Sequence, residues 1–189
     1  LDKRINRSFL DAGLGFGGFC LPKDLDAFIK ISEKLGYSFD LLKIVREINE
    51  SQVSDFIKKI KSSLWNIESK RVCVLGLSFK PNTDDLRFAP SLKIIEKLRE
   101  EGAKIRAFDP QSMSKAKDIL KDIYFAKDPY DAAKGCDCIL ILTEWNEFKD
   151  LDFVRLKKTM RYPLLIDGRN LYEKDKLAKL GFTYMGIGR

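Results

Sequence analysis

The chain of 189 residues is 44% hydrophobic and 33% charged, which suits a folded protein of one domain or one domain with a helical appendage. Its net charge is +7, but the basic residues are spread over the helical stretches instead of forming one block, which argues against nucleic-acid binding. No apolar run approaches the roughly 20 residues of a membrane-spanning helix, and no signal peptide is visible, so we expect a cytoplasmic chain without membrane contact.

The first third of the chain is predicted to be helical around one glycine-rich loop. Residues 1–10 have the pattern of a helix end, and the loop occupies residues 11–21. A helix is predicted over residues 22–35, where Gly36 ends it. A second helix over residues 39–65 would span about 40 Å, a length typical of a link between domains or of a subunit interface, with a long core helix as the alternative. Its apolar stripe, at steps of three and four, consists of Leu41, Val45, Ile48, Gln52, Phe56, Ile60 and Leu64.

From about residue 70 onward, short apolar strands alternate with helices. Strands are predicted at residues 71–75, 104–108, 123–125, 138–142, 164–166 and 182–185. Helices are predicted at residues 90–101, 112–120, 129–134, 153–160 and 174–180. This alternation predicts a parallel sheet covered on both faces and, with right-handed crossovers, a Rossmann-like fold. We therefore expect an α/β protein with a helical segment over residues 1–66 and a Rossmann-like domain over residues 67–189.

One cysteine directly follows the glycine-rich loop. Residues 15–24 read Gly-Phe-Gly-Gly-Phe-Cys-Leu-Pro-Lys-Asp, so Cys20 lies beside a predicted helix start and close to Lys23. A thiolate is a strong nucleophile at neutral pH, and helix N-termini and cations favour the thiolate form of cysteine. The glycines allow a ligand to approach the backbone closely. The alternative is a glycine-rich turn next to a buried structural cysteine.

The chain contains no histidine and four cysteines. The absence of histidine excludes Ser-His-Asp and Cys-His catalysis within the chain and removes the commonest metal ligand. Cys73 lies in an apolar run and is expected in the core, while Cys136 and Cys138 lead into a strand without zinc-knuckle spacing. We therefore expect free thiols, a reducing compartment and no bound metal.

Polar segments follow several of the predicted strands, where the ligands of open parallel sheets bind. Residues 76–87 contain only one glycine and match the dinucleotide fingerprint poorly, but they offer Lys80 and Arg87 to an anion. The other segments are residues 109–110, residues 143–145 and residues 167–170, in which Arg169 is suited to bidentate phosphate binding. Together with Cys20, they predict a phosphorylated ligand between the sheet and the cysteine loop.

These motifs resemble the UDP-glucose 6-dehydrogenases among the nucleotide-sugar dehydrogenases. The matching segments are residues 2–5 with 15–24, residues 76–87 with 89–91, residues 143–145 and residues 167–169. The resemblance extends over essentially the whole chain, and the glycine–cysteine motif is specific. It implies the part of such an enzyme that contains the catalytic cysteine, the central helix and the UDP-binding domain, with UDP-glucose or UDP as ligand and a homodimer formed through the long helix.

The resemblance also implies roles for individual residues. Cys20 would attack the C6 aldehyde of UDP-glucose to give a thiohemiacetal and then a thioester, and Asp24 would help to position or activate the hydrolytic water. Arg87 would contact NAD across subunits. The implied substrate-binding residues are Arg4, Phe9, Leu10, Gly13, Phe16, Gly17, Lys80 and Arg169, of which Arg4 would reach the substrate of the neighbouring subunit. Phe19, where the family commonly has serine, and Phe88, where an acidic residue is common, depart from the pattern.

The family's NAD-binding Rossmann domain and its catalytic lysine and asparagine would lie before Leu1. We therefore expect NAD to be bound mainly by a domain outside this chain, and the chain alone to lack dehydrogenase activity. Two alternatives stay open: a dehydrogenase of another nucleotide sugar such as GDP-mannose, and a stand-alone module for nucleotide-sugar binding or dimerisation.

Overall fold

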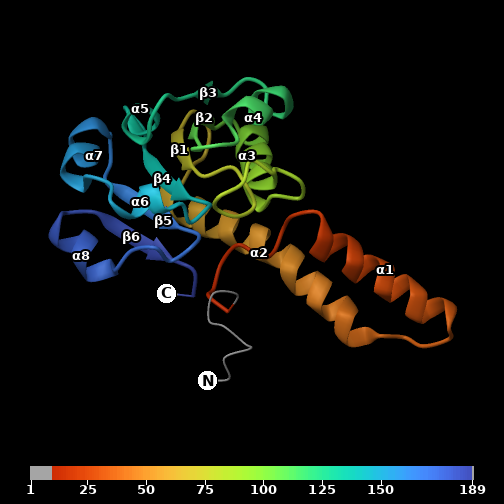
Figure 1. The fold of residues 1–189 in the computed structure, drawn as a ribbon. Coiled ribbons are helices and arrows are strands. Elements are labelled where there is room, and N and C mark those ends of the chain that lie inside the picture. Colours follow the sequence, from red (N-terminus) through yellow and green to blue (C-terminus); the bar gives the residue numbers. More distant parts are fainter. Residues whose placement is uncertain (1–9, 189) are drawn as a thin grey trace.

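The computed structural model describes residues 10–188 as a parallel sheet flanked by helices, with a two-helix arm that projects from it (Figure 1). The strands are β1 (Arg71–Leu75), β2 (Lys104–Phe108), β3 (Tyr124–Phe125), β4 (Cys138–Ile141), β5 (Leu164–Asp167) and β6 (Thr183–Gly186). The helices are α1 (Cys20–Lys34), α2 (Asp40–Leu64), α3 (Pro90–Glu100), α4 (Met113–Ile119), α5 (Pro129–Ala133), α6 (Asn146–Lys149), α7 (Phe153–Thr159) and α8 (Lys174–Lys179).

All six strands pair in parallel, in the order β3-β2-β1-β4-β5-β6. The strand order reverses between β1 and β4, which is the switch point where doubly wound sheets bind ligands. Alternate residues of β1 face opposite sides, so that Val72 and Val74 join one buried cluster and Cys73 and Leu75 join the other. The predicted Rossmann-like α/β fold is confirmed, and burial on both faces explains why its central strands are continuous apolar runs.

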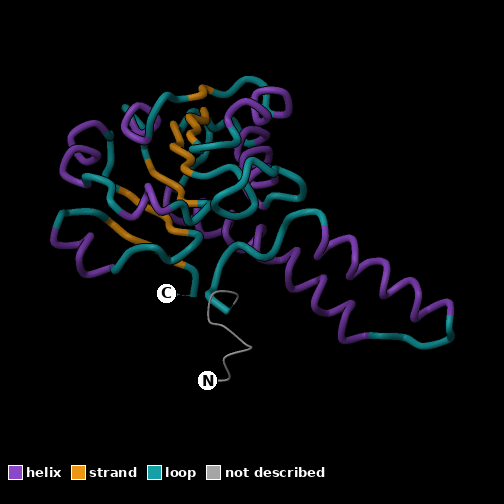
Figure 2. Tube along the Cα trace, viewed as in Figure 1, coloured by secondary structure: helices purple, strands orange, loops and turns teal. Residues whose placement is uncertain are grey.

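Helix α2 belongs to the core at one end and to the arm at the other (Figures 1 and 2). Phe56 and Ile60 are buried beneath the sheet, whereas Leu41 and Ile48 of the same apolar stripe are 64% and 56% exposed. The alternative of a core helix thus holds only for its last turns. Ion pairs between Lys43 and Glu33 and between Arg46 and Asp26 join α2 to α1.

Two local features differ from the sequence prediction. Helix α1 begins at Cys20 rather than Pro22. A proline is tolerated in the first turn because the N–H groups there have no intrahelical acceptor, so its missing N–H costs no hydrogen bond. Helix α6 was not predicted, since four residues show no helical periodicity. The expected helix end over residues 1–10, with Arg4 and Phe9, lies outside the described residues except for Leu10. None of the described helices is long and apolar enough to cross a bilayer.

Candidate functional site

The glycine–cysteine loop, residues 11–19, lies on the carboxyl edge of the sheet. The side chain of Leu14 is buried in the core cluster that contains Leu140 of β4 and Ile166 of β5. Gly13 lies against Arg169, which follows β5, because a Cβ atom on this glycine would come within 2.7 Å of the guanidinium Nη1. The cysteine loop and the segment after β5 therefore meet at the edge where the sequence predicted a phosphorylated ligand between them.

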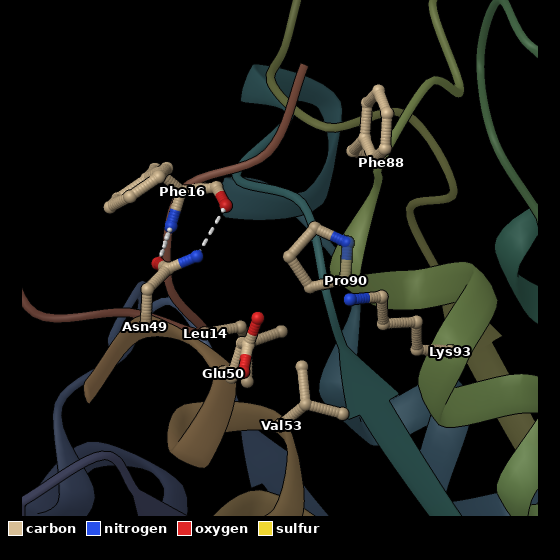
Figure 3. A pocket seen from close by; sticks show the side chains of 8 residues that line it. All are labelled: Leu14, Phe16, Asn49, Glu50, Val53, Phe88, Pro90 and Lys93. Carbon is tan, nitrogen blue, oxygen red and sulfur yellow. Dashed lines mark hydrogen bonds between the residues drawn. The ribbon is translucent and has the colours of Figure 1, made fainter. Parts of the chain in front are cut away.

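An asparagine of α2 holds this loop in place (Figure 3). The Asn49 Oδ1 accepts a hydrogen bond from the Phe16 N–H at 2.7 Å, and its Nδ2 donates to the Phe16 carbonyl oxygen at 3.1 Å. One side-chain amide thus satisfies both backbone groups of a loop residue that is 33 positions away in the chain. The small cavity beside this contact has a volume of about 20 Å³, which is far too small for a nucleotide sugar.

The glycines next to the cysteine allow close contact with the loop that follows β1. The Gly18 N–H donates to the carbonyl oxygen of Arg87 at 3.0 Å, and Gly18 has a φ of +80°. A Cβ atom on Gly17 would lie 2.5 Å from the carbonyl oxygen of Phe88, and one on Gly18 would lie 2.7 Å from the ring of Phe79. These glycines therefore make room for other parts of the protein, whereas the sequence prediction assigned that room to a ligand.

Cys20 is the only exposed thiol of the four cysteines. It lies in the first turn of α1, so the alternative of a buried structural cysteine is wrong for this residue. Burial raises the pKa of Cys136 to about 12 and raises the pKa of Cys73 and of Cys138 as well. Close to Cys20, the Lys23 Nζ lies 2.7 Å from Asp24 Oδ1, and both of these side chains are largely exposed.

Asp109, which the sequence marked as a possible ligand residue, instead organises the loop after β1. Its buried carboxylate accepts hydrogen bonds from the N–H groups of Leu77 and Ser78, at 2.7 and 3.1 Å, and from Trp145 Nε1 at 3.1 Å. Burial raises the pKa of Asp109, but backbone hydrogen bonds, the one from Leu77 first among them, lower it overall.

This carboxylate occupies donors that a dinucleotide would need. In dinucleotide-binding domains, backbone N–H groups after the first strand hold the pyrophosphate. Here the N–H groups of Leu77 and Ser78 already donate to Asp109. The residues at this position therefore do not fit a dinucleotide.

Arg169 and Lys80 follow β5 and β1 and differ in their surroundings. Arg169 Nη2 donates to Glu144 Oε1 at 2.6 Å, and Nε lies 2.5 Å from Oε2 in an ion pair. Both side chains are half-buried. Lys80 is exposed, and its ammonium lies 5.4 Å from the ring centre of Phe79. Sequence reasoning missed Glu144 as the partner of Arg169, although both belong to segments that it singled out.

Two family models match the chain. The model of the UDP binding domain of the UDP-glucose/GDP-mannose dehydrogenase family matches residues 73–174, and that of the central domain matches residues 1–51. The chain belongs to this family. Among curated relatives, UDP-glucose 6-dehydrogenases of Rhizobium meliloti and Bacillus subtilis are each 42% identical over the whole chain. The chain spans less than half of these relatives, 44% and 41% of their lengths.

Solved structures of the family have the same fold. A UDP-glucose dehydrogenase from Pyrobaculum islandicum superposes with a TM-score of 0.85 at 35% identity, over 99% of this chain and 41% of that one. A UDP-D-ManNAc dehydrogenase from Pyrococcus horikoshii gives 0.77 at 31% identity, over 94% and 40%. The sequence-based assignment to the nucleotide-sugar dehydrogenases is confirmed.

Proposed function

We propose that this chain is the substrate-binding and thiol-bearing part of an NAD-dependent UDP-glucose 6-dehydrogenase, which oxidises UDP-glucose to UDP-glucuronate. The observation that carries the proposal is the position of the cysteine loop, which lies on the carboxyl edge of the family's UDP-binding domain with Gly13 against Arg169. The only exposed thiol, Cys20, follows directly on that loop. The relatives named above carry the same activity in their names.

In this proposal the nucleotide diphosphate binds near Lys80 and Arg169. Glu144 engages Nε and Nη2 of Arg169 and leaves Nη1, which faces Gly13, for a phosphate oxygen. The cysteine loop would contact the sugar and the diphosphate. Its proposed contact residues are Leu10, Gly13, Phe16 and Gly17, and Phe9 and Arg4 are proposed from the sequence alone.

The proposed chemistry is centred on Cys20. Its thiolate forms a bond to the C6 aldehyde carbon, and the resulting thiohemiacetal loses a hydride to leave a thioester. Water positioned by Asp24 then cleaves the C–S bond and releases the carboxylate and the thiol. Two oxidations are needed, of the C6 alcohol to the aldehyde before the thiolate attack and of the thiohemiacetal to the thioester after it, and NAD⁺ would accept the hydride in each. Since the loop after β1 does not fit a dinucleotide, we assign NAD⁺ mainly to the part of the relatives that this chain does not span, with Arg87 as the contact from this chain.

We further propose that a second copy of the chain covers the arm. Helices α1 and α2 expose large apolar side chains over their projecting parts, and such a surface is typical of an interface. These side chains are Phe28, Ile31, Leu41, Ile44, Val45 and Ile48. The same proposal includes a homodimer, a boundary between the helical segment and the Rossmann-like domain at residues 66 and 67, and a cytoplasmic location.

Calorimetry with the purified chain tests the substrate. We expect UDP-glucose to bind more tightly than GDP-mannose, and NAD⁺ with UDP-glucose to give no turnover. Tighter binding of GDP-mannose would favour the alternative dehydrogenase. Turnover by the chain alone would contradict the assignment of NAD⁺ to another part of the protein. No binding of either nucleotide sugar to the folded chain would overturn the substrate site.

A further inference from the structure

Phe19, the residue before Cys20, lies near two cations although it is 42% exposed. The Arg87 guanidinium carbon is 4.7 Å from the ring centre of Phe19, and the Lys23 ammonium is 5.5 Å from it. Both distances lie within the range of about 6 Å over which a guanidinium or ammonium group is attracted to the face of an aromatic ring. An exposed aromatic ring beside the cysteine thus has two charged neighbours.

Arg87 is also fixed from its other side. Its Nε and Nη2 donate to the Asp85 carboxylate at 3.0 and 2.7 Å, and its carbonyl oxygen accepts the hydrogen bond from Gly18. The hydrogen bond to Arg87 is the main cause that lowers the pKa of Asp85. The guanidinium is therefore held by a carboxylate, an aromatic ring and its own backbone.

Both cations lie within electrostatic reach of the thiol. The pKa of Arg87 is raised, mainly by Asp85 and to a smaller extent by Cys20. The pKa of Lys23 is likewise raised, mainly by Asp24, with a smaller contribution from Cys20. The two cations thus come from different segments, and each is paired with a carboxylate, Arg87 with Asp85 and Lys23 with Asp24. The ring of Phe19 contacts both cations.

We propose that Phe19 is a positioning residue that holds the Arg87 guanidinium and the Lys23 ammonium beside Cys20, so that the thiol faces a site that attracts carboxylates. The proposal deepens the proposed function, on which it rests, because a carboxylate is the group that would form at C6 next to this thiol. An aliphatic or hydroxyl side chain at position 19 would leave Arg87 paired only with Asp85.

Alkylation of Cys20 by two reagents tests this without any enzyme activity. The thiolate displaces iodide from iodoacetate, which is an anion, or from iodoacetamide, which is neutral, and an S–C bond replaces the C–I bond. Both reagents react with the same thiolate, so the ratio of their rates reports the charge around it. The other three thiols are buried, and a Cys20→Ser chain gives the background rate.

We expect Phe19→Leu to lower the iodoacetate/iodoacetamide rate ratio about two- to fivefold at low salt, which is the fold-change that corresponds to an exposed cation–π contact. Phe19→Tyr keeps the ring and should keep the ratio. Because Phe19 contacts two cations, the double variant Arg87→Gln/Lys23→Gln should lower the ratio at least as much as Phe19→Leu, and Phe19→Leu should add little in that background. High salt should reduce the differences among the variants. Phe28→Leu removes an exposed phenylalanine elsewhere on α1 and is the matched control.

An unchanged ratio in Phe19→Leu, together with a lowered one in Arg87→Gln, would show that Phe19 does not position the arginine. Equal ratios in all variants would show that no cation is held beside the thiol. If Phe19→Leu lowered the ratio by the same factor in the Arg87→Gln/Lys23→Gln background as in the unmodified chain, Phe19 would act independently of both cations, and the proposal would be overturned. Failure to bind a nucleotide sugar would overturn the proposed function alone, since these ratios do not depend on that ligand.

Discussion

Replacement of Asn49 by alanine should release the cysteine loop from α2. The substitution removes the two hydrogen bonds, at 2.7 and 3.1 Å, that satisfy the backbone of Phe16. Each such bond contributes about 0.5–1.5 kcal/mol, so the pair contributes about 1–3 kcal/mol. Alanine is the better helix former and returns about 0.5 kcal/mol. The free energy of unfolding should therefore fall by about 0.5–2.5 kcal/mol in urea denaturation, with an unchanged m-value.

Hydrogen exchange locates the effect in the loop. The amides of Phe16 and Gly18 should exchange faster in Asn49→Ala, because both depend on the docked loop, whereas the amides of β1 and β4 should lose no more protection than the global stability does. Asn49→Asp keeps the acceptor for the Phe16 N–H but loses the donor, and should give an intermediate result. Glu50→Ala on the same helix is the control, since Glu50 is exposed. If Asn49→Ala exchanged like the unmodified chain at Phe16, the loop would not be held by this side chain.

Three further outcomes follow from the site. Because the pKa of Asp109 is lowered in the folded state, its carboxylate contributes stability above the unfolded pKa of about 3.9, and this stability is lost as the pH falls through the folded pKa. Asp109→Asn should therefore reduce the loss of stability between pH 5 and pH 2 in urea titrations, and an unaltered pH profile would contradict this. Calorimetry should show that Cys20→Ala binds UDP as the unmodified chain does, whereas Lys80→Ala and Arg169→Ala should each weaken UDP binding by about 1–3 kcal/mol. Loss of UDP binding in a folded Cys20→Ala chain would indicate a structural cysteine. A thiol reagent should modify one cysteine per native chain and four after denaturation, and faster reaction of a second native thiol would contradict the burial of the other three.

The sheet could be predicted from the sequence because burial on both faces leaves a pattern within each strand. Runs such as Arg71–Leu75 and Cys138–Ile141 are short, are apolar apart from Arg71 and lie close to glycines, and the predicted strands and their order of appearance are confirmed. The arm could not be predicted in the same way. Periodicity identifies an apolar stripe on α2, but it does not say that Phe56 packs on the sheet while Leu41 does not.

The position of the candidate residues at the sheet edge could be predicted, but their contacts could not. Polar residues after strands lie at the carboxyl edge in any parallel sheet, and Arg169 and Lys80 do so here. Whether such a residue holds a ligand or the protein itself depends on partners far away in sequence. Asp109 satisfies backbone N–H groups more than 30 residues earlier, and Asn49 is a polar residue in a helix with no motif around it.

Helix α2 contacts both the cysteine loop and the core of the sheet. The helix is embedded in the core by Phe56 and Ile60, carries the loop through Asn49 and continues into the arm. A rotation of the arm about the embedded end would displace Phe16 along with the helix, while Arg169 would stay with the sheet. The position of the cysteine loop relative to the carboxyl edge of the sheet therefore depends on the orientation of α2 as well as on the loop's own contacts with Arg169 and Arg87, so that a force on the exposed end of the arm would act on both sets of contacts.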